Sequence, residues 1–486
     1  MPVMELLAPA GNVEKLAYAY QYGADAAYIG LKQFSLRVKA DNFYEDEYKA
    51  VAALKKQFPG RSLHCALNIA FHNREIDAFL AQIDYFKQYP IDAFIVQDLG
   101  VVPILQKHFP QAHLHVSTQA SVMNREAVKM YKNIGFDRVV LAREVSLAEV
   151  REIKDAVPDM EIECFAHGAM CIAYSGRCLM SAYLTGRSAQ SGFCSHTCRW
   201  DYDVLADAKK IAESGALFLR ERKRPDALFP VYEGDDFTAV LSSKDLRMIE
   251  HLDDMQRAGV DSIKIEGRMK SVYYVAMMTR AYRKALDALA GTITAEEAAP
   301  FVASLDEVAH RESTTGFFYG RAEADKTTVG ASDSPYELAG RVGAEYDAAQ
   351  TDAVFAAGAD MLAARARERE AMHPKARAAA EKDAAAHPEK CPTALQRRDG
   401  WHLYPYTSYN KTEAGAELEL ITPDVLKIVL GAERYVFANP KNGAIIPFVN
   451  PDHDCALYTD LVIPAGALVR TKDAGYEDGV IRKTGR

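Results

Sequence analysis

The sequence predicts an α/β protein whose first two thirds fold as a (β/α)8 barrel of the TIM type. Short apolar runs alternate with longer amphipathic stretches about eight times in roughly the first 285 residues. The amphipathic stretches place apolar residues three and four positions apart, which is typical of helices that cover a sheet. About eight strand–helix units in ~270 residues match a closed barrel. An open doubly wound sheet is the alternative, but no G-x-G-x-x-G follows the first apolar run.

The individual elements can be read in chain order. The expected strands are the runs MELLAPAG, AAYIGL, SLHCALNI, AFIVQDLG, LHVSTQA, RVVLARE, IECFAHG and SIKIEGR. The expected helices between them include residues 12–25, 75–89, 125–135 and 147–157. After the last run, residues 271–291 have a strong helical pattern that closes the barrel, and residues 294–311 are expected to form a further helix.

Polar residues follow several of these strands directly. The five polar strand ends are Asn68, Gln97–Asp98, Ser117–Thr118–Gln119, Arg143–Glu144 and His167. Active sites of such barrels lie at the carboxyl ends of the strands. We therefore expect a polar mouth at that end of the barrel.

A long interruption, residues 168–255, separates the seventh run from the eighth. It is too long for a simple connection, which favours a functional insertion. We expect the barrel to be a catalytic domain at residues 1–320. Residues 321–397 are expected to be a linker and an Ala-rich helical insertion, because Ala, Arg and Glu favour helix. Residues 398–486 alternate like short strands with Gly, Pro and Asn turns, which predicts a small β-barrel domain.

Charge and composition limit the classes of partner. The net charge of −9 argues against broad electrostatic attraction to nucleic acid. RNA binding would need a local patch, such as the basic run Arg220, Arg222, Lys223 and Arg224, although a solvated surface is the simpler interpretation of that run. The start lacks a signal-peptide pattern and no apolar window approaches ~18 residues, so we expect a cytoplasmic protein without membrane contact. The sequence also lacks H-E-x-x-H, G-x-S-x-G and G-x-x-x-x-G-K-[ST] motifs.

Four cysteines gather within the interruption in the pattern C-x6-C-x15-C-x3-C: Cys171, Cys178, Cys194 and Cys198. Thiols in the cytoplasm stay reduced, so clustered cysteines are better interpreted as metal ligands or catalytic residues than as disulfides. Four thiolates suit an iron–sulfur cluster or a structural zinc. The pattern lacks the paired CxxC knuckles of common zinc ribbons, which makes a zinc site less favoured than an iron–sulfur cluster. Spacing alone leaves cluster, zinc and catalytic thiols open.

Further candidate site residues lie at the expected ends of the seventh and eighth strands. His167 follows the seventh strand and acts either on a substrate or as a structural residue. Lys264, Glu266 and Arg268 alternate along the last strand and should share one face. Buried charges must pair or bind something. They form either a structural network or an anion site, whose candidate donors to a carboxylate or phosphate are Arg177, Arg199 and Arg268.

Several long stretches together resemble the peptidase U32, or collagenase-like, family. They are ELLAPAGNVEKLAYAYQYGADAAYIGL, HVSTQASVMN, RVVLAREVSLAEV, HGAMCIAYSGRCLMSAYLTGR, CRWDY, SSKDL and SIKIEGRMKSVYYV. The resemblance covers roughly residues 4–320 and, more loosely, the β-rich end with AELELITP. The family was named for collagenase-like proteases, whereas members similar to this chain are associated with oxygen-independent hydroxylation of RNA or of ubiquinone precursors. The HGAMC–YSGRC–CRW form is most similar to the bacterial tRNA hydroxylation branch.

The resemblance implies a cofactor and a co-substrate. It implies a [4Fe-4S] cluster on Cys171, Cys178 and Cys194. In the ubiquinone branch the fourth ligand lies near the position of Leu228 or Phe229, where this chain has no cysteine. We therefore assign Cys198 as the fourth ligand. The absence of a cysteine at the downstream position favours the tRNA branch. Zinc is the alternative metal. That branch makes 5-hydroxyuridine at the anticodon wobble position with prephenate as the hydroxyl source.

The expected protein is thus an iron–sulfur RNA hydroxylase that binds the tRNA anticodon loop and a small dicarboxylate. The residues expected to shape its active mouth are His167, Arg177, Arg199, Lys264, Glu266 and Arg268. The alternative is a U32-type peptidase. It would need an activated nucleophile, for which the chain offers only a pairing of Cys171 or Cys194 with His167 or His196.

Overall fold

The computed structural model divides the chain into two compact units, with the boundary between Asp333 and Ser334. It describes residues 3–31, 34–35, 42–171, 175, 178, 198, 243–320, 334–387, 391–451 and 453–473, and the backbone of residues 217–220, 228–233 and 238–239. The two units are treated separately below. No helix in these ranges is both long enough and apolar enough to cross a membrane.

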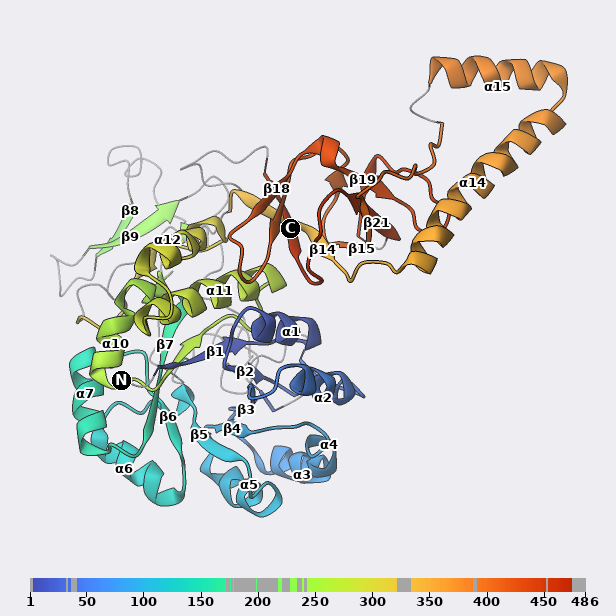
Figure 1. Ribbon diagram of the computed structural model, residues 1–486. Coiled ribbons are helices and arrows are strands. Elements are labelled where there is room, and N and C mark those ends of the chain that lie inside the picture. The colour runs from blue at the N-terminus through green and yellow to red at the C-terminus, as the bar shows by residue number, and fades with distance from the viewer. Residues whose placement is uncertain are drawn as a thin grey trace. The chain divides into compact units, whose positions relative to one another are not determined.

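Eight parallel strands form the first unit, and they close into a barrel (Figure 1). In chain order they are β1 (Glu5–Pro9), β2 (Ala26–Ile29), β3 (Ser62–Leu67), β4 (Ala93–Val96), β5 (His113–Val116), β6 (Arg138–Val140), β7 (Glu161–Ala169) and β12 (Ser262–Ile265). Closure comes from β12, which pairs in parallel with both β7 and β1. Each strand overlaps one of the eight runs read from the sequence, with only β5, at its start, and β7, at both ends, reaching one residue beyond theirs, so the predicted TIM-like barrel is confirmed.

Helices surround the barrel and connect its strands (Figure 1). They are α1 (Val13–Gln21), α2 (Tyr48–Gln57), α3 (Asn73–Ala81), α4 (Ile83–Phe86), α5 (Val102–His108), α6 (Arg125–Ile134), α7 (Leu147–Ala156), α10 (Leu252–Ala258), α11 (Val272–Leu289) and α12 (Ala295–Ala303). Short 3-10 turns add η1 (Leu99–Val101), η2 (Thr118–Ala120), η5 (Ile249–His251) and η6 (Ser304–Glu307). The single helix expected at residues 75–89 is wrong, because α3 ends at Ala81 and α4 begins at Ile83.

Side-chain caps explain where several helices begin. Asn12, Asn124 and Ser271 each accept a hydrogen bond from the backbone three residues on, at the first turns of α1, α6 and α11. Ser146 and Thr294 form capping boxes at the starts of α7 and α12. The local sequence therefore determines where these helices begin.

The insertion leaves the barrel from β7 and returns to it through β11 (Asp245–Arg247). The last three residues of β7 pair antiparallel with β11, and β13 (Ser313–Thr314) extends this edge in parallel. Within the insertion, β8 (Leu217–Arg220), β9 (Leu228–Glu233) and β10 (Thr238–Ala239) form an antiparallel sheet. Because β7 continues to Ala169, His167 lies inside the strand rather than after it, which corrects the expected strand end.

The second unit is a curved antiparallel sheet that forms half a barrel. Its seven strands, in spatial order, are β18 (Ile428–Leu430), β17 (Leu418–Ile421), β22 (Leu468–Lys472), β14 (Tyr336–Val342), β15 (His402–Ser408), β21 (Cys455–Thr459) and β19 (Tyr435–Ala438). A two-stranded sheet of β16 (Thr412–Glu413) and β20 (Phe448–Val449) and the turn η8 (Ala432–Arg434) complete it. The predicted β-rich C-terminal part is confirmed, but β14 precedes the Ala-rich stretch and the alternation pattern did not reveal it.

The Ala-rich stretch forms two helices between β14 and β15, as its composition predicted. They are α14 (Ala348–Ala371) and α15 (Pro374–Ala386). Val354 of α14 is buried in a cluster with Leu403 and Tyr458 of the sheet. The buried side of α14 also passes close to a turn, since a Cβ on Gly443 would lie 2.6 Å from the Cα of Gly358. The first turns of α14 therefore anchor this insertion, while α15 has no buried residue.

Three charged side chains lie buried inside the barrel, and together with the partly buried Glu5 they form ion pairs with one another. The Lys264 ammonium is 2.7 Å from one carboxylate oxygen of Glu163, and the Arg138 guanidinium is 3.1 Å from the other. Arg138 also binds Glu5 at 2.6 Å. Burial raises the pKa of Glu163, but the adjacent Lys264 and Arg138 outweigh it and hold that pKa below its usual value. These carboxylates are therefore ionised and their charges are matched.

Two buried imidazoles share this interior. The rings of His64 on β3 and His115 on β5 meet edge to face, with centroids 4.8 Å apart. In the described part of the chain, the Nδ1 atom of each ring has no hydrogen-bond partner. Burial lowers the pKa of His64 to about 4, and it lowers the pKa of His115 well below its usual value. Both rings are therefore neutral at pH 7.

Removing the Arg138 charge should destabilise the barrel strongly. Arg138→Met leaves the buried Glu163 and the partly buried Glu5 with only part of their charge compensation, so we expect a loss of about 3–5 kcal/mol in the free energy of unfolding. Urea unfolding of the full chain measures it. Arg125→Met, which removes an exposed guanidinium beside Glu126, is the control and should cost less than about 1 kcal/mol. Equal losses in the two variants would contradict the assignment.

The neutral His64 makes stability depend on pH. Its folded pKa of about 4 lies below that of the unfolded chain, so between about pH 6.5 and pH 4 only the unfolded chain takes up the proton. Stability should therefore fall as the pH falls through this window. His64→Phe should reduce the slope by about 1.4 kcal/mol per pH unit between pH 6.5 and pH 5, measured by urea unfolding. A slope that matches the wild type would show that His64 does not titrate this way, and His453→Gln at an exposed position is the control.

Candidate active site

Polar side chains line the carboxyl ends of the barrel strands, and several of them hold the local backbone. Asp98, after β4, accepts hydrogen bonds from the backbone N–H groups of Phe71 and Gly100, both at 2.8 Å. The Thr118 hydroxyl, after β5, donates to the carbonyl of Leu141 at 3.0 Å. These residues fix the loops around the mouth.

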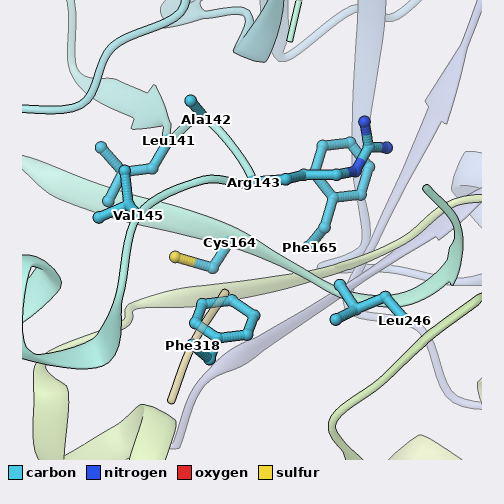
Figure 2. Close-up of a pocket in the computed structure, with 8 residues that line it drawn as sticks. All are labelled: Leu141, Ala142, Arg143, Val145, Cys164, Phe165, Leu246 and Phe318. Carbon is cyan, nitrogen blue, oxygen red and sulfur yellow. The ribbon is translucent and has the colours of Figure 1, made fainter. Parts of the chain in front are cut away.

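Arg143 places a positive charge at the mouth. Its guanidinium lies 3.9 Å from the centroid of the Phe165 ring, and Figure 2 shows the two groups stacked. One guanidinium nitrogen is 3.6 Å from a carboxylate oxygen of Glu266, which is a loose ion pair. The Arg143 side chain is only 11% exposed. The sequence predicted Arg143 to be a polar residue at a strand end, but Arg143 was not among the predicted residues of the active site.

Arg143 and Phe165 also line a small cavity. Its other lining residues are Leu141, Ala142, Val145, Cys164, Leu246 and Phe318 (Figure 2). It has room for about one water molecule. Burial raises the pKa of the Cys164 thiol far above its usual value, so this thiol stays protonated. The cavity is too small for a substrate and is part of the packing.

The structure places Lys264, Glu266 and Arg268 in three different environments. Lys264 pairs with Glu163 inside the barrel, and its ammonium lies 4.5 Å from the centroid of the Tyr28 ring. Glu266 pairs with Arg143. Arg268 is buried beside Gly30, where an added Cβ would lie 2.3 Å from a guanidinium nitrogen. The strand β12 ends at Ile265, so the strand alternation does not extend to Glu266 and Arg268, and the choice between a structural network and an anion site stays a prediction.

His167 is buried and bonded to the helix α11. Its Nδ1 lies 3.2 Å from the Tyr282 hydroxyl, which donates its single proton to the carbonyl of Ala166 at 2.8 Å. Nδ1 must therefore carry the proton and donate to Tyr282, which leaves Nε2 with the lone pair. Burial lowers the pKa of His167 to about 3, so the ring is neutral at pH 7.

The orientation of His167 follows from an irregularity in the sheet. Lys264 pairs with Phe165, whereas the next residue, Ile265, pairs with His167. This shift adds one residue to β7, and such a bulge redirects side chains. Glu163 and Phe165 contact the interior cation Lys264, whereas His167 meets α11. The role of His167 at the mouth remains a prediction.

The cysteine cluster begins two residues after β7 ends. Cys171 is exposed, and Cys178 and Cys198 are partly buried; none of the three forms a disulfide with another described residue. Cys194 lies outside the described residues, as do His196, Arg177 and Arg199. Reduced thiols next to a barrel mouth suit a soft metal or an iron–sulfur cluster in their chemistry. Among the described residues no three His, Cys, Asp or Glu side chains form a group that could hold a metal ion.

Comparison with known proteins gives a consistent set of relatives. The family model described as Peptidase family U32 matches residues 11–328. "tRNA hydroxylation protein P1" of Bacillus subtilis (strain 168) is 39% identical over 344 residues, which cover 70% of this chain and 76% of that protein. "tRNA hydroxylation protein P" of Escherichia coli (strain K12) is 38% identical over 342 residues, which cover 64% of this chain and 74% of that protein. "23S rRNA 5-hydroxycytidine C2501 synthase" of Escherichia coli (strain K12) is 36% identical over 339 residues, which cover 68% of this chain and 47% of that protein.

The bond between His167 and Tyr282 can be tested through stability. Tyr282→Phe leaves His167 Nδ1–H and the Ala166 carbonyl without their partner, so we expect a loss of about 1–3 kcal/mol in the free energy of unfolding. Tyr48→Phe removes a hydroxyl from a partly exposed ring of α2 and should cost less than about 1 kcal/mol. Urea unfolding of both variants makes the comparison. A Tyr282→Phe variant as stable as the wild type would refute the proposed tautomer.

Proposed function

Because the chain belongs to peptidase family U32, we propose that it is an RNA hydroxylase, and that it makes 5-hydroxyuridine at the wobble position of tRNA. The observation that carries this proposal is the identity of 38–39% with two proteins named for tRNA hydroxylation. The match extends over about 340 residues, and the family model covers residues 11–328, which include the barrel and its insertion. The rRNA 5-hydroxycytidine synthase is similar as well, which supports hydroxylation of RNA pyrimidines more broadly.

The chemistry requires an accessible base. A pyrimidine inside a duplex is stacked and shielded, so an enzyme that modifies it needs a single-stranded loop or a flipped nucleotide. The anticodon loop presents the wobble base in this way. The phosphate groups of the RNA are bound by cationic side chains of a protein. Our predicted contact with these phosphates is the basic run Arg220, Arg222, Lys223 and Arg224. Arg220 ends β8, and the other three residues lie outside the described part of the chain.

The proposed cofactor is a [4Fe-4S] cluster held by Cys171, Cys178, Cys194 and Cys198, with zinc as the alternative metal. When bound, a cluster supplies the electron-transfer chemistry that the thiolates and imidazoles of the chain lack. Cys171, Cys178 and Cys198 form no disulfide with one another or with any other described residue, and the affinity of thiolates for iron supports this assignment.

Arg143 is the described residue best placed to bind the proposed dicarboxylate co-substrate, prephenate. Its guanidinium is held by the Phe165 ring and is paired only loosely with Glu266, at 3.6 Å. A carboxylate of the co-substrate could form two parallel hydrogen bonds with that guanidinium. Glu266 would then act as the partner of Arg143 in the free enzyme and yield to the co-substrate.

The alternative, a collagenase-like peptidase, needs a thiolate beside a base. In the described structure His167 binds Tyr282, and its low pKa makes it a poor base. RNA hydroxylation is therefore the better supported function. Cleavage of gelatin that persists with a chelator and is lost in a single Cys→Ala variant would favour the peptidase instead.

Analysis of tRNA nucleosides tests the proposed function. Deletion of the gene should abolish 5-hydroxyuridine and its derivatives in tRNA, and the wild-type gene should restore them. Cys178→Ser should fail to restore them because it removes a proposed ligand, whereas Cys391→Ser, in the second unit, should restore them fully. Mass spectrometry of digested tRNA makes the measurement. Unchanged tRNA in the deletion strain would refute the proposal, and a lost rRNA modification would redirect it to rRNA.

A further inference from the structure

The segment that carries Cys171 and Cys178 is bound to the barrel mouth at Ser175. Ser175 is buried, with 6% of its surface exposed. Its backbone N–H donates to one carboxylate oxygen of Glu144 at 2.9 Å, and its hydroxyl donates to the other at 3.2 Å. Its hydroxyl oxygen accepts from the Arg143 backbone N–H at 3.4 Å, and its carbonyl accepts from the Ser121 hydroxyl. Every polar group of Ser175 is thus bonded to residues that follow β5 and β6.

The residues that hold Ser175 are themselves fixed. Glu144 follows Arg143, whose guanidinium stacks on Phe165. Ser121 has a left-handed backbone with φ 55° and ψ 44°, a conformation that non-glycine residues seldom adopt. Hydrogen bonds to a carboxylate are stronger than neutral ones, so the two bonds to Glu144 dominate this attachment. The mouth therefore provides a rigid, charged anchor.

We propose that Glu144 is a positioning residue for the thiols of Cys171 and Cys178, acting through Ser175. Cys171 lies four residues before Ser175 and Cys178 three residues after it. An extended chain spans at most about 3.6 Å per residue, so both cysteines stay within roughly 14 Å of the anchor. This inference rests on the proposed function for the assumption that the two thiols bind the cofactor. It assigns to the polar end of β6 the task of holding the ligand segment.

Hydrogen exchange tests the anchor without any metal. In the full-length, metal-free protein, Glu144→Ala should raise the exchange rate of the peptide covering residues 171–178 by about tenfold, because Ser175 loses two bonds to a charged acceptor. Glu144→Gln keeps one acceptor oxygen and should give a smaller increase. Glu152→Ala, at an exposed carboxylate on α7, should change nothing. A peptide from β4, in the same barrel, reports in each variant whether the first unit is folded, and unchanged exchange at residues 171–178 in both Glu144 variants would overturn the proposal.

Iron content after anaerobic reconstitution tests positioning. With iron and sulfide supplied, Glu144→Ala should bind iron at least about fivefold less tightly than the wild type, and Glu144→Gln should lie between them. Iron per chain and the visible absorption of thiolate–iron bonds measure this. Faster exchange with wild-type iron binding would overturn the positioning role. A wild-type protein that binds no iron would refute the proposed cofactor instead, and the exchange data would still decide whether Glu144 holds the segment.

Discussion

The buried ion pairs inside the barrel are the interaction on which the rest of the structure depends. Arg138, Glu163, Lys264 and Glu5 come from β6, β7, β12 and β1, which are neighbours around the barrel. These four strands contain the seam at which the sheet closes. Residues far apart in sequence meet here, since Lys264 follows Glu163 by 101 positions and Arg138 follows Glu5 by 133. Any misplacement of β12 would leave charges unpaired in a medium of low polarity, which is costly.

This seam also determines how the mouth is built. The insertion with the cysteines starts from β7, and the chain rejoins the barrel through β11 and β12. Because Glu163 and Lys264 fix β7 and β12 against each other, the seam places the start of the insertion beside the strand ends of β5 and β6. Those ends provide Ser121, Arg143 and Glu144, which bind Ser175. Polar strand ends in a barrel of this kind can therefore serve to hold a ligand-bearing loop as well as to contact a substrate.

The sequence predicted the fold because the signals for it are local. Eight apolar runs, the amphipathic stretches between them and the capping residues of the helices depend on neighbours within a few positions. The split between α3 and α4 at Gln82 and the strand β14 ahead of the Ala-rich helices were not predicted. The strand β14 is stabilised by pairing with β22 and β15, which lie more than 50 residues away in the sequence. Its own composition does not predict a strand.

The sequence by itself determined the barrel, the family resemblance and the cysteine-bearing segment, since residue type and spacing carry that information. Only the tertiary structure decided what the individual site candidates touch. Alternation would place His167 with Glu163 and Phe165, but one extra residue in β7 turns it to Tyr282. Alternation likewise places Lys264, Glu266 and Arg268 on one face of a strand, yet β12 ends at Ile265, before Glu266 and Arg268. Strand register and strand length are set by pairing between distant segments, and a single sequence does not record them.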